Sequence, residues 1–306
     1  MMMKYVYLKQ YPNVFKKMTG LWVKEFDALC DDVLPQFKQS EEERLDRPER
    51  QRDLGGGRKA SLGPRDQILL TVIWLRLYPT QDVLGYFFGV SQAVVSNYVA
   101  HTLPVLEQAG RDTMRMPDPG RKRRPGLSQL LEAMPDVMVV IDSFEQKVQR
   151  PPDKDEQKRY YSGKKKQHTL KSQVAVDEET GRVVDISDSV PGPTADLKLL
   201  VQSGLLSRLP EGVGGMGDLG YTGIDKLHPL SAAPRRKPRG KDRPPEDVIY
   251  NTTFSQRRII VENSIGRMRR YQSITQADRH HRQLHMSRVV AIAGLINRQI
   301  GHRLVH

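Results

Sequence analysis

The sequence has one cysteine, Cys30, in 306 residues, and it has no long hydrophobic run. A single thiol cannot form an internal disulfide or a cysteine-built zinc site, which fits a reducing compartment. No window approaches the roughly 20 apolar residues that a membrane span needs. The N-terminus, MMMKYVYLKQ, also lacks the apolar stretch of a signal peptide. These absences argue against a secreted or membrane protein, and we expect a cytoplasmic one with no membrane partner.

Common catalytic motifs are absent as well. No P-loop is present, and the Gly-x-Gly fragments near Asp218 lack the strand, turn and helix context of a dinucleotide site. No serine or cysteine nucleophile motif stands out. Three histidines have a loosely metal-like spacing but lack cysteines or a second matching pair. We interpret them as surface residues: His280, His281 and His285.

Positive charge, in contrast, is in excess. The chain has 49 lysines and arginines against 36 aspartates and glutamates, which gives a net charge of +13 at pH 7. Such an excess indicates a polyanionic partner, with nucleic acid as the leading candidate. Ribosome-associated and simply basic proteins share this property, so the function has to be inferred from the motifs.

The hydrophobic pattern divides the chain into four segments. Residues 1–60 are predicted to form a helical lead and a linker, and residues 61–110 a helix-turn-helix domain. Residues 111–135 are predicted to be a basic linker. Residues 136–306 are predicted to form an α/β or α+β domain with a basic insertion at about 224–254.

Three helices are predicted within residues 61–110. The first has Pro64 in its first turn, the second begins after Thr80, and the third extends over 92–106, where Pro104 kinks or ends it. Two helices joined by a short turn containing a glycine form the helix-turn-helix pattern. The third helix exposes polar residues that could reach a major groove, namely Gln92, Ser96 and Asn97. A plain three-helix bundle explains the pattern equally well.

From residue 136 the pattern changes to that of strands. The apolar run 137–141 is typical of a strand buried on both faces, and we expect it to end at Asp142. Strands over 168–177 and 182–190 would complete an antiparallel meander. The remaining predicted elements are a helix over 196–209 capped by Thr194, a short strand near Asp218, an extended basic loop over 234–243, and helices over about 255–271 and 282–300.

Three widely spaced carboxylates are candidates for a metal site. Asp142 lies at a strand end, Asp218 lies between glycines that let a ligand approach closely, and Glu262 lies on a helix. Converging carboxylates can hold two divalent cations about 3.5–4 Å apart, an arrangement that suits phosphodiester chemistry with Mg²⁺ or Mn²⁺. The alternative is a strand-end, a turn and a helix-surface residue, because a chain with 36 acidic residues has many such triples.

Two groups of basic residues accompany the carboxylates. Arg258 and Arg269 lie close to the helix face that carries Glu262, where they could hold phosphates. An ordinary Arg258–Glu262 ion pair explains the same spacing. The second group follows Tyr160 and Tyr161 at a predicted hairpin and suits a DNA backbone; its members are Lys164, Lys165, Lys166, His168 and Lys171. A solvated basic hairpin is the alternative.

Together these motifs resemble bacterial insertion-sequence transposases of the DDE superfamily, in the group akin to PIF/Harbinger transposases. The resemblance covers most of the chain. Besides the helix-turn-helix it includes Gly55-Gly56-Gly57-Arg58-Lys59, Val140-Ile141-Asp142-Ser143, Tyr161-Ser162-Gly163-Lys164-Lys165-Lys166-Gln167-His168-Thr169-Leu170-Lys171, Asp218-Leu219-Gly220-Tyr221-Thr222-Gly223 and Arg258-Ile259-Ile260-Val261-Glu262-Asn263-Ser264-Ile265-Gly266-Arg267-Met268-Arg269. The departures are Ser255 in place of the usual tyrosine, Gly192-Pro193-Thr194-Ala195-Asp196 where relatives often read Gly-x-x-His-Asp, and a glycine-rich strand before Asp218.

The resemblance implies an α/β fold: an RNase H-like catalytic domain, with a mixed sheet flanked by helices, preceded by an all-α helix-turn-helix domain. Asp142, Asp218 and Glu262 would be the catalytic and metal-binding triad with two Mg²⁺ or Mn²⁺ ions per active site, and Arg258 and Arg269 would assist them. Such enzymes bind the terminal inverted repeats of their element, cleave its ends and use the freed 3′-hydroxyl to attack target DNA.

Bringing two DNA ends together leads us to expect a homodimer or a larger synaptic assembly, associated with the bacterial nucleoid. Two other functions remain open at this point. One is a catalytically silent DNA-binding protein derived from a transposase, and the other is a general two-metal nuclease.

Overall fold

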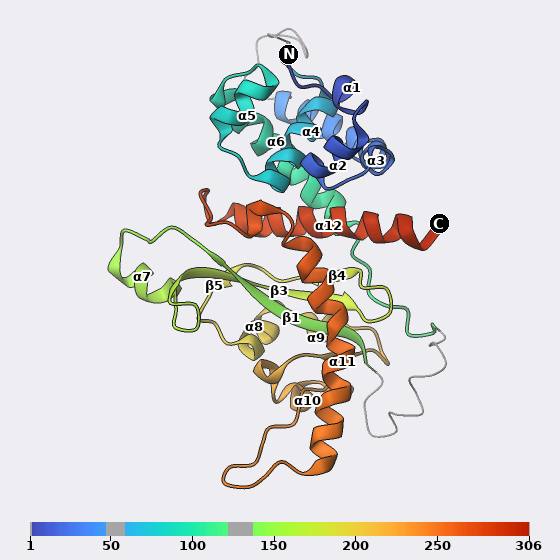
Figure 1. Ribbon diagram of the computed structural model, residues 1–306, viewed down its shortest axis with the longest axis vertical. Coiled ribbons are helices and arrows are strands. Elements are labelled where there is room, and N and C mark those ends of the chain that lie inside the picture. Colours follow the sequence, from blue (N-terminus) through green and yellow to red (C-terminus); the bar gives the residue numbers. More distant parts are fainter. Residues whose placement is uncertain (1, 47–58, 122–136, 306) are drawn as a thin grey trace. The chain divides into compact units, whose positions relative to one another are not determined.

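The computed structural model describes residues 2–46, 59–121 and 137–305 (Figure 1). The Gly55-Gly56-Gly57-Arg58 motif and most of the predicted basic linker lie outside the described residues. The chain divides into two compact units. The helical unit contains Met1–Thr113, Arg269–Thr275 and Ser287–His306, and the sheet unit contains Met114–Met268 and Gln276–Met286. The functional domain boundaries drawn from the sequence stay a prediction.

The helical unit is built around one buried helix. Its elements are α1 (Tyr5–Leu8), α2 (Pro12–Thr19), α3 (Val23–Leu45), α4 (Pro64–Leu77), α5 (Gln81–Phe88), α6 (Gln92–Arg111) and most of α12 (Leu284–Val305). Pro64 occupies the first turn of α4, as predicted, and every residue from Gln67 to Leu75 is buried. The helices α1, α2, α3, α5 and α6 all contact α4, and Figure 1 shows α4 in their midst. A helix enclosed in this way needs apolar residues all round.

The helices α5 and α6 form the predicted helix-turn-helix. The Thr80 hydroxyl accepts a hydrogen bond from the Val83 amide, and Gly89 ends α5 with a φ of 68°. The two helices are bent by 97° at the turn, which lies in the range of this motif. α6 does not end at Pro104 but continues to Arg111, because its apolar face stays packed beyond the proline.

Among the described residues, no single helix is long and apolar enough to cross a bilayer. In this part of the chain, α5 and α6 reach that length and composition only when taken together, and the bend at the turn interrupts them.

Within the described residues, the sheet unit contains a mixed sheet of six strands. They are β1 (Val137–Lys147), β2 (Tyr161–Ser162), β3 (Gln167–Asp177), β4 (Val183–Ile186), β5 (Val190–Pro191) and β6 (Gly214–Met216). The order is β2-β3-β1-β6, and β4 and β5 also pair with β3. β1 and β3 are antiparallel, whereas β6 pairs with β1 in parallel.

The predicted antiparallel meander is confirmed by the pairing of β1, β3 and β4. Two details of the prediction are wrong. The predicted strand over 182–190 is divided into β4 and β5. β1 does not end at Asp142 but runs on to Lys147, because β3 continues to pair with it as far as Thr169.

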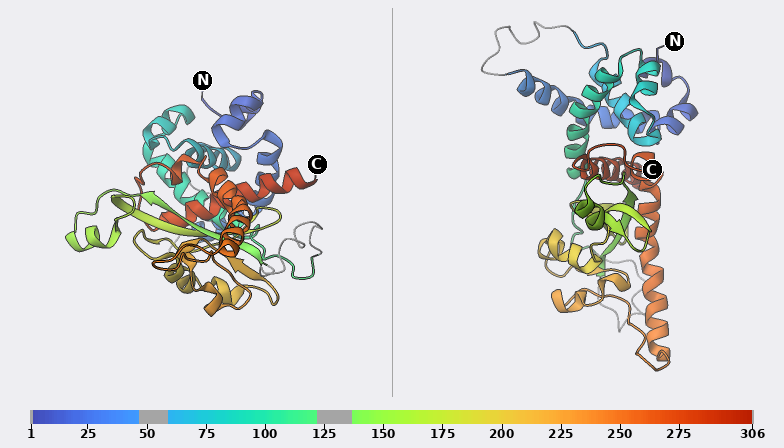
Figure 2. Two further views of the ribbon diagram at one scale, coloured as in Figure 1. Left: turned by 60° about the horizontal axis from the view of Figure 1, so that its bottom comes forward. Right: turned by 90° about the vertical axis from the view of Figure 1, so that its left-hand side faces the viewer.

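Helices cover both faces of the sheet (Figure 2). α8 (Asp196–Ser203), α9 (Leu205–Arg208) and α10 (Ile224–Leu227) lie on one side, and α11 (Pro245–Met268) runs along the other. α7 (Lys154–Tyr160) precedes β2. The core under the first group of helices includes Val139, Ile141, Leu200, Leu205 and Tyr221. A mixed sheet enclosed by helices fits the RNase H-like fold that we predicted.

Two helices of the sheet unit differ from the prediction. The helix expected over 196–209 is broken at Gly204, whose φ is 64°, and its N-cap is Ala195 rather than Thr194. α11 begins at Pro245 instead of near residue 255, and it therefore takes up the end of the predicted basic insertion. Proline and the acidic residues Glu246 and Asp247 in the first turn favour a helix start at this point.

Candidate active site

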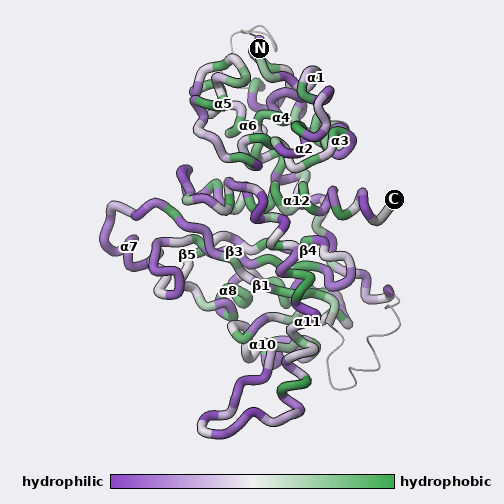
Figure 3. Tube along the Cα trace, in the orientation of Figure 1, coloured by the Kyte–Doolittle hydropathy of each residue, from purple (hydrophilic) through white to green (hydrophobic). Residues whose placement is uncertain are grey.

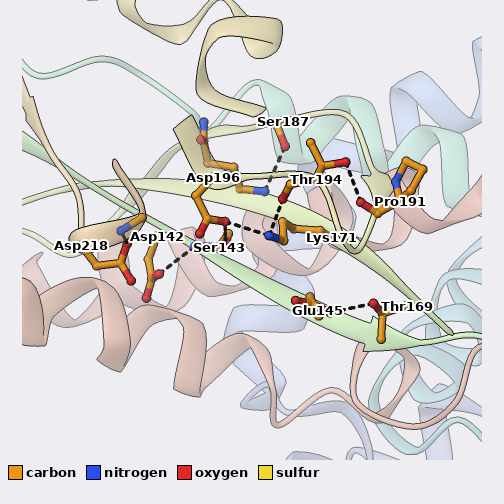
Figure 4. Close-up of polar contacts among 12 residues, drawn as sticks. Asp142, Ser143, Glu145, Thr169, Lys171, Ser187, Pro191, Thr194, Asp196 and Asp218 are labelled. Atoms are coloured by element: carbon orange, nitrogen blue, oxygen red, sulfur yellow. Dashed lines mark hydrogen bonds and ion pairs between the residues drawn. The ribbon is translucent and has the colours of Figure 1, made fainter. Parts of the chain in front are cut away.

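Asp142 lies on β1, and Asp218 follows the end of the neighbouring parallel strand β6 at the same level. In the β1–β6 pair, Val140 lies opposite Met216, and each aspartate follows its strand's paired residue by two positions. Neighbouring strands are about 4.8 Å apart. The two carboxylates therefore lie side by side where β6 ends and β1 continues (Figure 4).

Both aspartates are held by backbone amides. The Ser143 amide donates to Asp142 Oδ1 at 2.8 Å, and the Gly220 amide donates to Asp218 Oδ1 at 2.8 Å. Asp218 thereby caps the short 3-10 helix Leu219–Tyr221 that follows β6. These local hydrogen bonds hold Asp142 against β1 and Asp218 against the turn that follows β6.

The surroundings of Asp142 disfavour the charged form of its carboxyl group. Burial raises the pKa of its carboxyl group above the ordinary value, and the nearby carboxylates of Asp218 and Glu262 raise it further. The Ser143 amide and the Arg258 guanidinium act in the opposite direction but do not cancel these effects. A site with surplus negative charge of this kind favours a bound cation.

Glu262 lies on α11, and Arg258 lies between it and Asp142. Arg258 Nη2 lies 3.4 Å from Asp142 Oδ2 and 4.0 Å from Glu262 Oε1. The Glu262 side chain is 58% exposed, compared with 21% for Asp142. Arg269 follows the end of α11 at Met268, and its role beside the carboxylates stays a prediction.

The three predicted carboxylates do not form a closed ligand set. Within the described residues, no three acidic, histidine or cysteine side chains lie close enough together to hold a metal ion. The structure brings Asp142 and Asp218 together and places Glu262 within electrostatic reach of Asp142. The assignment of the triad stays a prediction.

The stretch of α11 that carries Glu262 is firmly attached to the sheet unit. Arg257 Nη2 donates to Glu178 Oε2 at 2.7 Å, and the Ser264 hydroxyl donates to the Gly181 carbonyl at 2.7 Å. Val261, next to the glutamate, is fully buried. The backbone of Glu262 is therefore fixed, and only its side chain is free to turn.

A fourth carboxylate at this site, Asp196, was missed by the sequence reasoning. Its Oδ1 accepts hydrogen bonds from the Ser143 hydroxyl at 2.7 Å and from Lys171 Nζ at 2.9 Å (Figure 4). Lys171 Nζ also donates to the Thr194 carbonyl at 2.6 Å. In the sequence, Asp196 begins a predicted helix and ends a motif that departs from the family pattern, and nothing in its spacing connects it to Asp142.

Asp196 also reaches the turn that carries Asp218. A Cβ atom added to Gly220 would lie 2.5 Å from Asp196 Oδ2 and 2.9 Å from Asp218 Oδ1. Only a glycine fits between the two carboxylates. Asp196 therefore contacts the residue that follows Asp142 and the turn that follows Asp218.

Tyr221 closes the buried side of the site. Burial raises the pKa of its hydroxyl well above the ordinary value, and Asp196, Asp142 and Asp218 add to the effect. Its ring packs against Gly217, where an added Cβ would lie 2.4 Å from ring atoms. This close approach gives a physical reason for glycine immediately before Asp218.

The basic motif at the β2–β3 hairpin separates into exposed and buried parts. Lys164, Lys165 and Lys166 are exposed at the turn, and His168 is half-buried with its ring 5.6 Å from the Tyr161 ring. Lys171, in contrast, is only 7% exposed and is paired with Asp196. Their role in DNA binding stays a prediction, and only the exposed lysines are open to a phosphate in this conformation.

The predicted groove-facing residues of α6 lie on its outer side. Gln92 and Asn97 are exposed and Ser96 is half-buried, whereas Val95 and Tyr98 are buried. Contact of these polar residues with DNA stays a prediction.

The interpretation of the three histidines as surface residues is wrong for His285. Its side chain is fully buried, and its Nδ1 lies 2.6 Å from the Ser189 hydroxyl oxygen.

Comparisons with known proteins agree with this architecture. A family model described as "DDE superfamily endonuclease" matches residues 141–297, and one described as "Helix-turn-helix of DDE superfamily endonuclease" matches residues 60–112. A "Probable transposase for insertion sequence element IS702" from Microchaete diplosiphon is 28% identical over 288 residues, which cover 94% of each chain. No solved structure matches the chain.

Proposed function

The chain belongs to the DDE superfamily of endonucleases and carries the helix-turn-helix domain of that family, and from this premise we propose that it binds the terminal inverted repeats of an insertion sequence, cleaves the element's ends and joins them to target DNA. The observation that carries the proposal is the parallel β1–β6 register, which aligns Asp142 with Asp218. Asp142, Asp218 and Glu262 are the proposed catalytic and metal-binding residues.

The donor set fits a hard divalent cation. Carboxylate oxygens are the ligands that Mg²⁺ and Mn²⁺ prefer. Burial, with a smaller contribution from the carboxylates of Asp218 and Glu262, raises the pKa of Asp142, and a bound cation would offset both effects. DDE endonucleases generally use divalent ions, and a bound pair supplies an activated water or 3′-hydroxyl and stabilisation of the leaving oxygen. Asp142 and Asp218 would provide a fixed pair of ligands, and Glu262 would complete the set by turning its exposed side chain.

The neighbouring residues have complementary roles in this proposal. Arg258, 3.4 Å from Asp142, would hold the scissile phosphate beside the carboxylates. Asp196 and Lys171 would keep Ser143 in place, so that its amide continues to donate to Asp142. The exposed lysines 164–166 and the outer side of α6 would bind the DNA backbone and the repeat sequence. Two DNA ends have to meet for strand transfer, so we propose a homodimer or a larger assembly.

The test is cleavage by the full-length protein of labelled duplex DNA from the edges of the element that carries its gene, with Mg²⁺ or Mn²⁺. We expect cuts at the element ends that require the metal. Asp142→Asn and Asp218→Asn should each reduce cleavage about 10²–10³-fold, the usual effect of removing one group that stabilises a transition state. Asp188→Asn is the matched control, because Asp188 is an exposed acid of the same unit.

Two results would contradict the proposal. Metal-dependent cleavage that ignores the end sequence would identify a general nuclease. Specific binding of the ends without any cleavage, by a folded and multimeric protein, would identify a catalytically silent DNA-binding protein.

A further inference from the structure

A cavity of about 420 Å³ lies beside the turn that follows Asp218. Its walls come from Thr222 and Gly223 of that turn, from Asp225 and Pro229, from the segment 231–236, and from Tyr250 of α11. This volume is typical of sites that hold a small organic group. None of the residues that line it has a role in the function proposed above.

One wall of the cavity is a stacked pair, Arg235 over Tyr250. The guanidinium carbon lies 4.4 Å from the centre of the tyrosine ring, and Arg235 Nη1 donates to Asp247 Oδ1 at 2.9 Å. Asn251 holds the backbone of Arg235 from both sides, through contacts of 2.8 Å and 3.0 Å. These contacts hold the guanidinium beside the ring, and the Arg235 side chain is 46% exposed.

A second arginine joins the cavity to the carboxylate site. Arg236 Nε donates to the Thr222 hydroxyl at 3.1 Å, and Nη2 lies 3.5 Å from the Leu219 carbonyl oxygen. Thr222 follows Asp218 by four residues, so their Cα atoms are at most about 14 Å apart. The cavity is therefore close to the carboxylates that we assign to cleavage.

The chain that continues from the cavity is strongly basic and exposed. Lys237, Arg239, Lys241 and Arg243 lie in it with a single acid, Asp242, and Figure 3 shows this loop as hydrophilic over most of its length. Such a segment attracts a phosphate backbone. A flat guanidinium–aromatic surface beside it attracts the π-face of a base.

We propose that this cavity binds one unpaired nucleotide of the DNA strand next to the cut. The base stacks on the Arg235 plane that Tyr250 supports, Arg236 contacts the phosphate, and the loop 237–243 follows the backbone. Recognition by stacking accepts any base. The position next to the cut rests on the proposed function, whereas binding of an unpaired nucleotide does not.

The experiment compares binding of two DNA hairpins by the full-length protein in fluorescence anisotropy, without divalent metal. The hairpins share one duplex sequence and are closed by a polyethylene glycol linker that carries no bases, but one ends blunt and the other in a short unpaired extension. We expect the wild-type protein to bind the extended hairpin about ten-fold more tightly, which corresponds to the stacking of one base. Arg235→Ala and Tyr250→Leu should remove the preference, whereas Tyr250→Phe should keep it. Tyr250→Leu should leave binding of the blunt hairpin unchanged, and Arg235→Ala should weaken it no more than the loss of one charge from the loop does.

Arg239→Ala is the matched control, because it removes an equal charge from the exposed loop outside the cavity. It should weaken binding of both hairpins equally. Arg236→Ala leaves the Arg235–Tyr250 pair intact and should reduce the preference even if Arg235→Ala destabilises the start of α11. Equal binding of both hairpins by the wild-type protein, or a preference that survives Arg235→Ala and Tyr250→Leu, would overturn the proposal.

The two proposals fail separately. A preference for the unpaired extension in a protein that cuts no DNA with metal would reject the proposed function and keep the nucleotide site. Metal-dependent cleavage of the element ends without that preference would keep the proposed function and reject the nucleotide site.

Discussion

The acids on the strands and the acid on the helix are held in different ways. Asp142 and Asp218 are placed by strand register, and each accepts a backbone hydrogen bond. Glu262 has a fixed backbone on α11 but an exposed side chain whose nearest positive group is Arg258, 4.0 Å away. In the proposed function, the strand acids would therefore be preorganised for a cation, and the helix acid would be ordered only when one binds.

The strand acids are supported by a largely buried ion pair, Lys171 with Asp196. The Lys171 side chain is 9% exposed and that of Asp196 is 22% exposed, and together they hold the Ser143 hydroxyl. A pair buried to this extent loses much of its hydration, so its value lies in fixing geometry more than in adding stability. The helix side has no comparable polar network around Glu262 among the contacts of the described residues.

The largest effect on stability is expected from Lys171→Met. The substitution keeps most of the side-chain volume but leaves the Asp196 carboxylate without its cation, and breaking such a pair destabilises by about 3–5 kcal/mol. Urea unfolding of the full-length protein measures this loss. Lys164→Met is the control at an exposed position of the same motif and should change stability by less than about 0.5 kcal/mol. Equal effects of the two substitutions would show that the network does not hold the site.

The sequence predicted the strand acids better than their surroundings. The apolar run before Asp142 indicates a buried strand, although β1 continues past Asp142 to Lys147, and the glycines around Asp218 indicate a close turn. These signals are local. The contact between Asp196 and Ser143 joins α8 to β1 across 53 residues, so no periodicity reveals it. The parallel partner strand, Gly214–Met216, is also too short to show an alternating pattern.

The burial of Lys171 was unpredictable for a related reason. The basic motif continues without a break from the exposed turn at Lys164 into β3. Residues of β3 are buried from Thr169 onward because helices cover both faces of the sheet. Charge alone does not mark where the motif passes from solvent into the core. The helical unit was easier to predict from the sequence, because the burial of α4 and the turn at Gly89 are signalled by residues that are neighbours in the chain.

Replacing one glycine beside the strand acids and one on the helix that carries Glu262 tests whether the two regions differ in how firmly they hold their acids. A Cβ at Gly220 would press on Asp196 Oδ2 and Asp218 Oδ1, whereas a Cβ at Gly266 of α11 meets nothing within 4 Å. We expect Gly220→Ala to reduce metal-dependent cleavage about 10–100-fold, as for other losses of support around metal ligands. Gly266→Ala should leave cleavage unchanged and stabilise the protein by up to about 1 kcal/mol, because alanine favours a helix.

Cleavage kinetics and thermal unfolding of both variants give the measurement. Reduced cleavage by Gly266→Ala, or full activity of Gly220→Ala, would mean that cleavage does not depend on the close placement of Asp196 and Asp218 around Gly220.

The smallest expected change is the stability of Glu262→Gln without metal. Its side chain is 58% exposed and meets Arg258 only at 4.0 Å, so the free energy of unfolding should change by less than about 0.5 kcal/mol. Cleavage should nevertheless fall as far as in Asp142→Asn, because the amide removes a proposed ligand. Added Mg²⁺ separates the two regions: the thermal midpoint should rise less in Glu262→Gln than in the wild-type protein and should not rise in Asp142→Asn. A large loss of stability in metal-free Glu262→Gln would place the glutamate among the preorganised groups and remove the distinction between strand and helix acids.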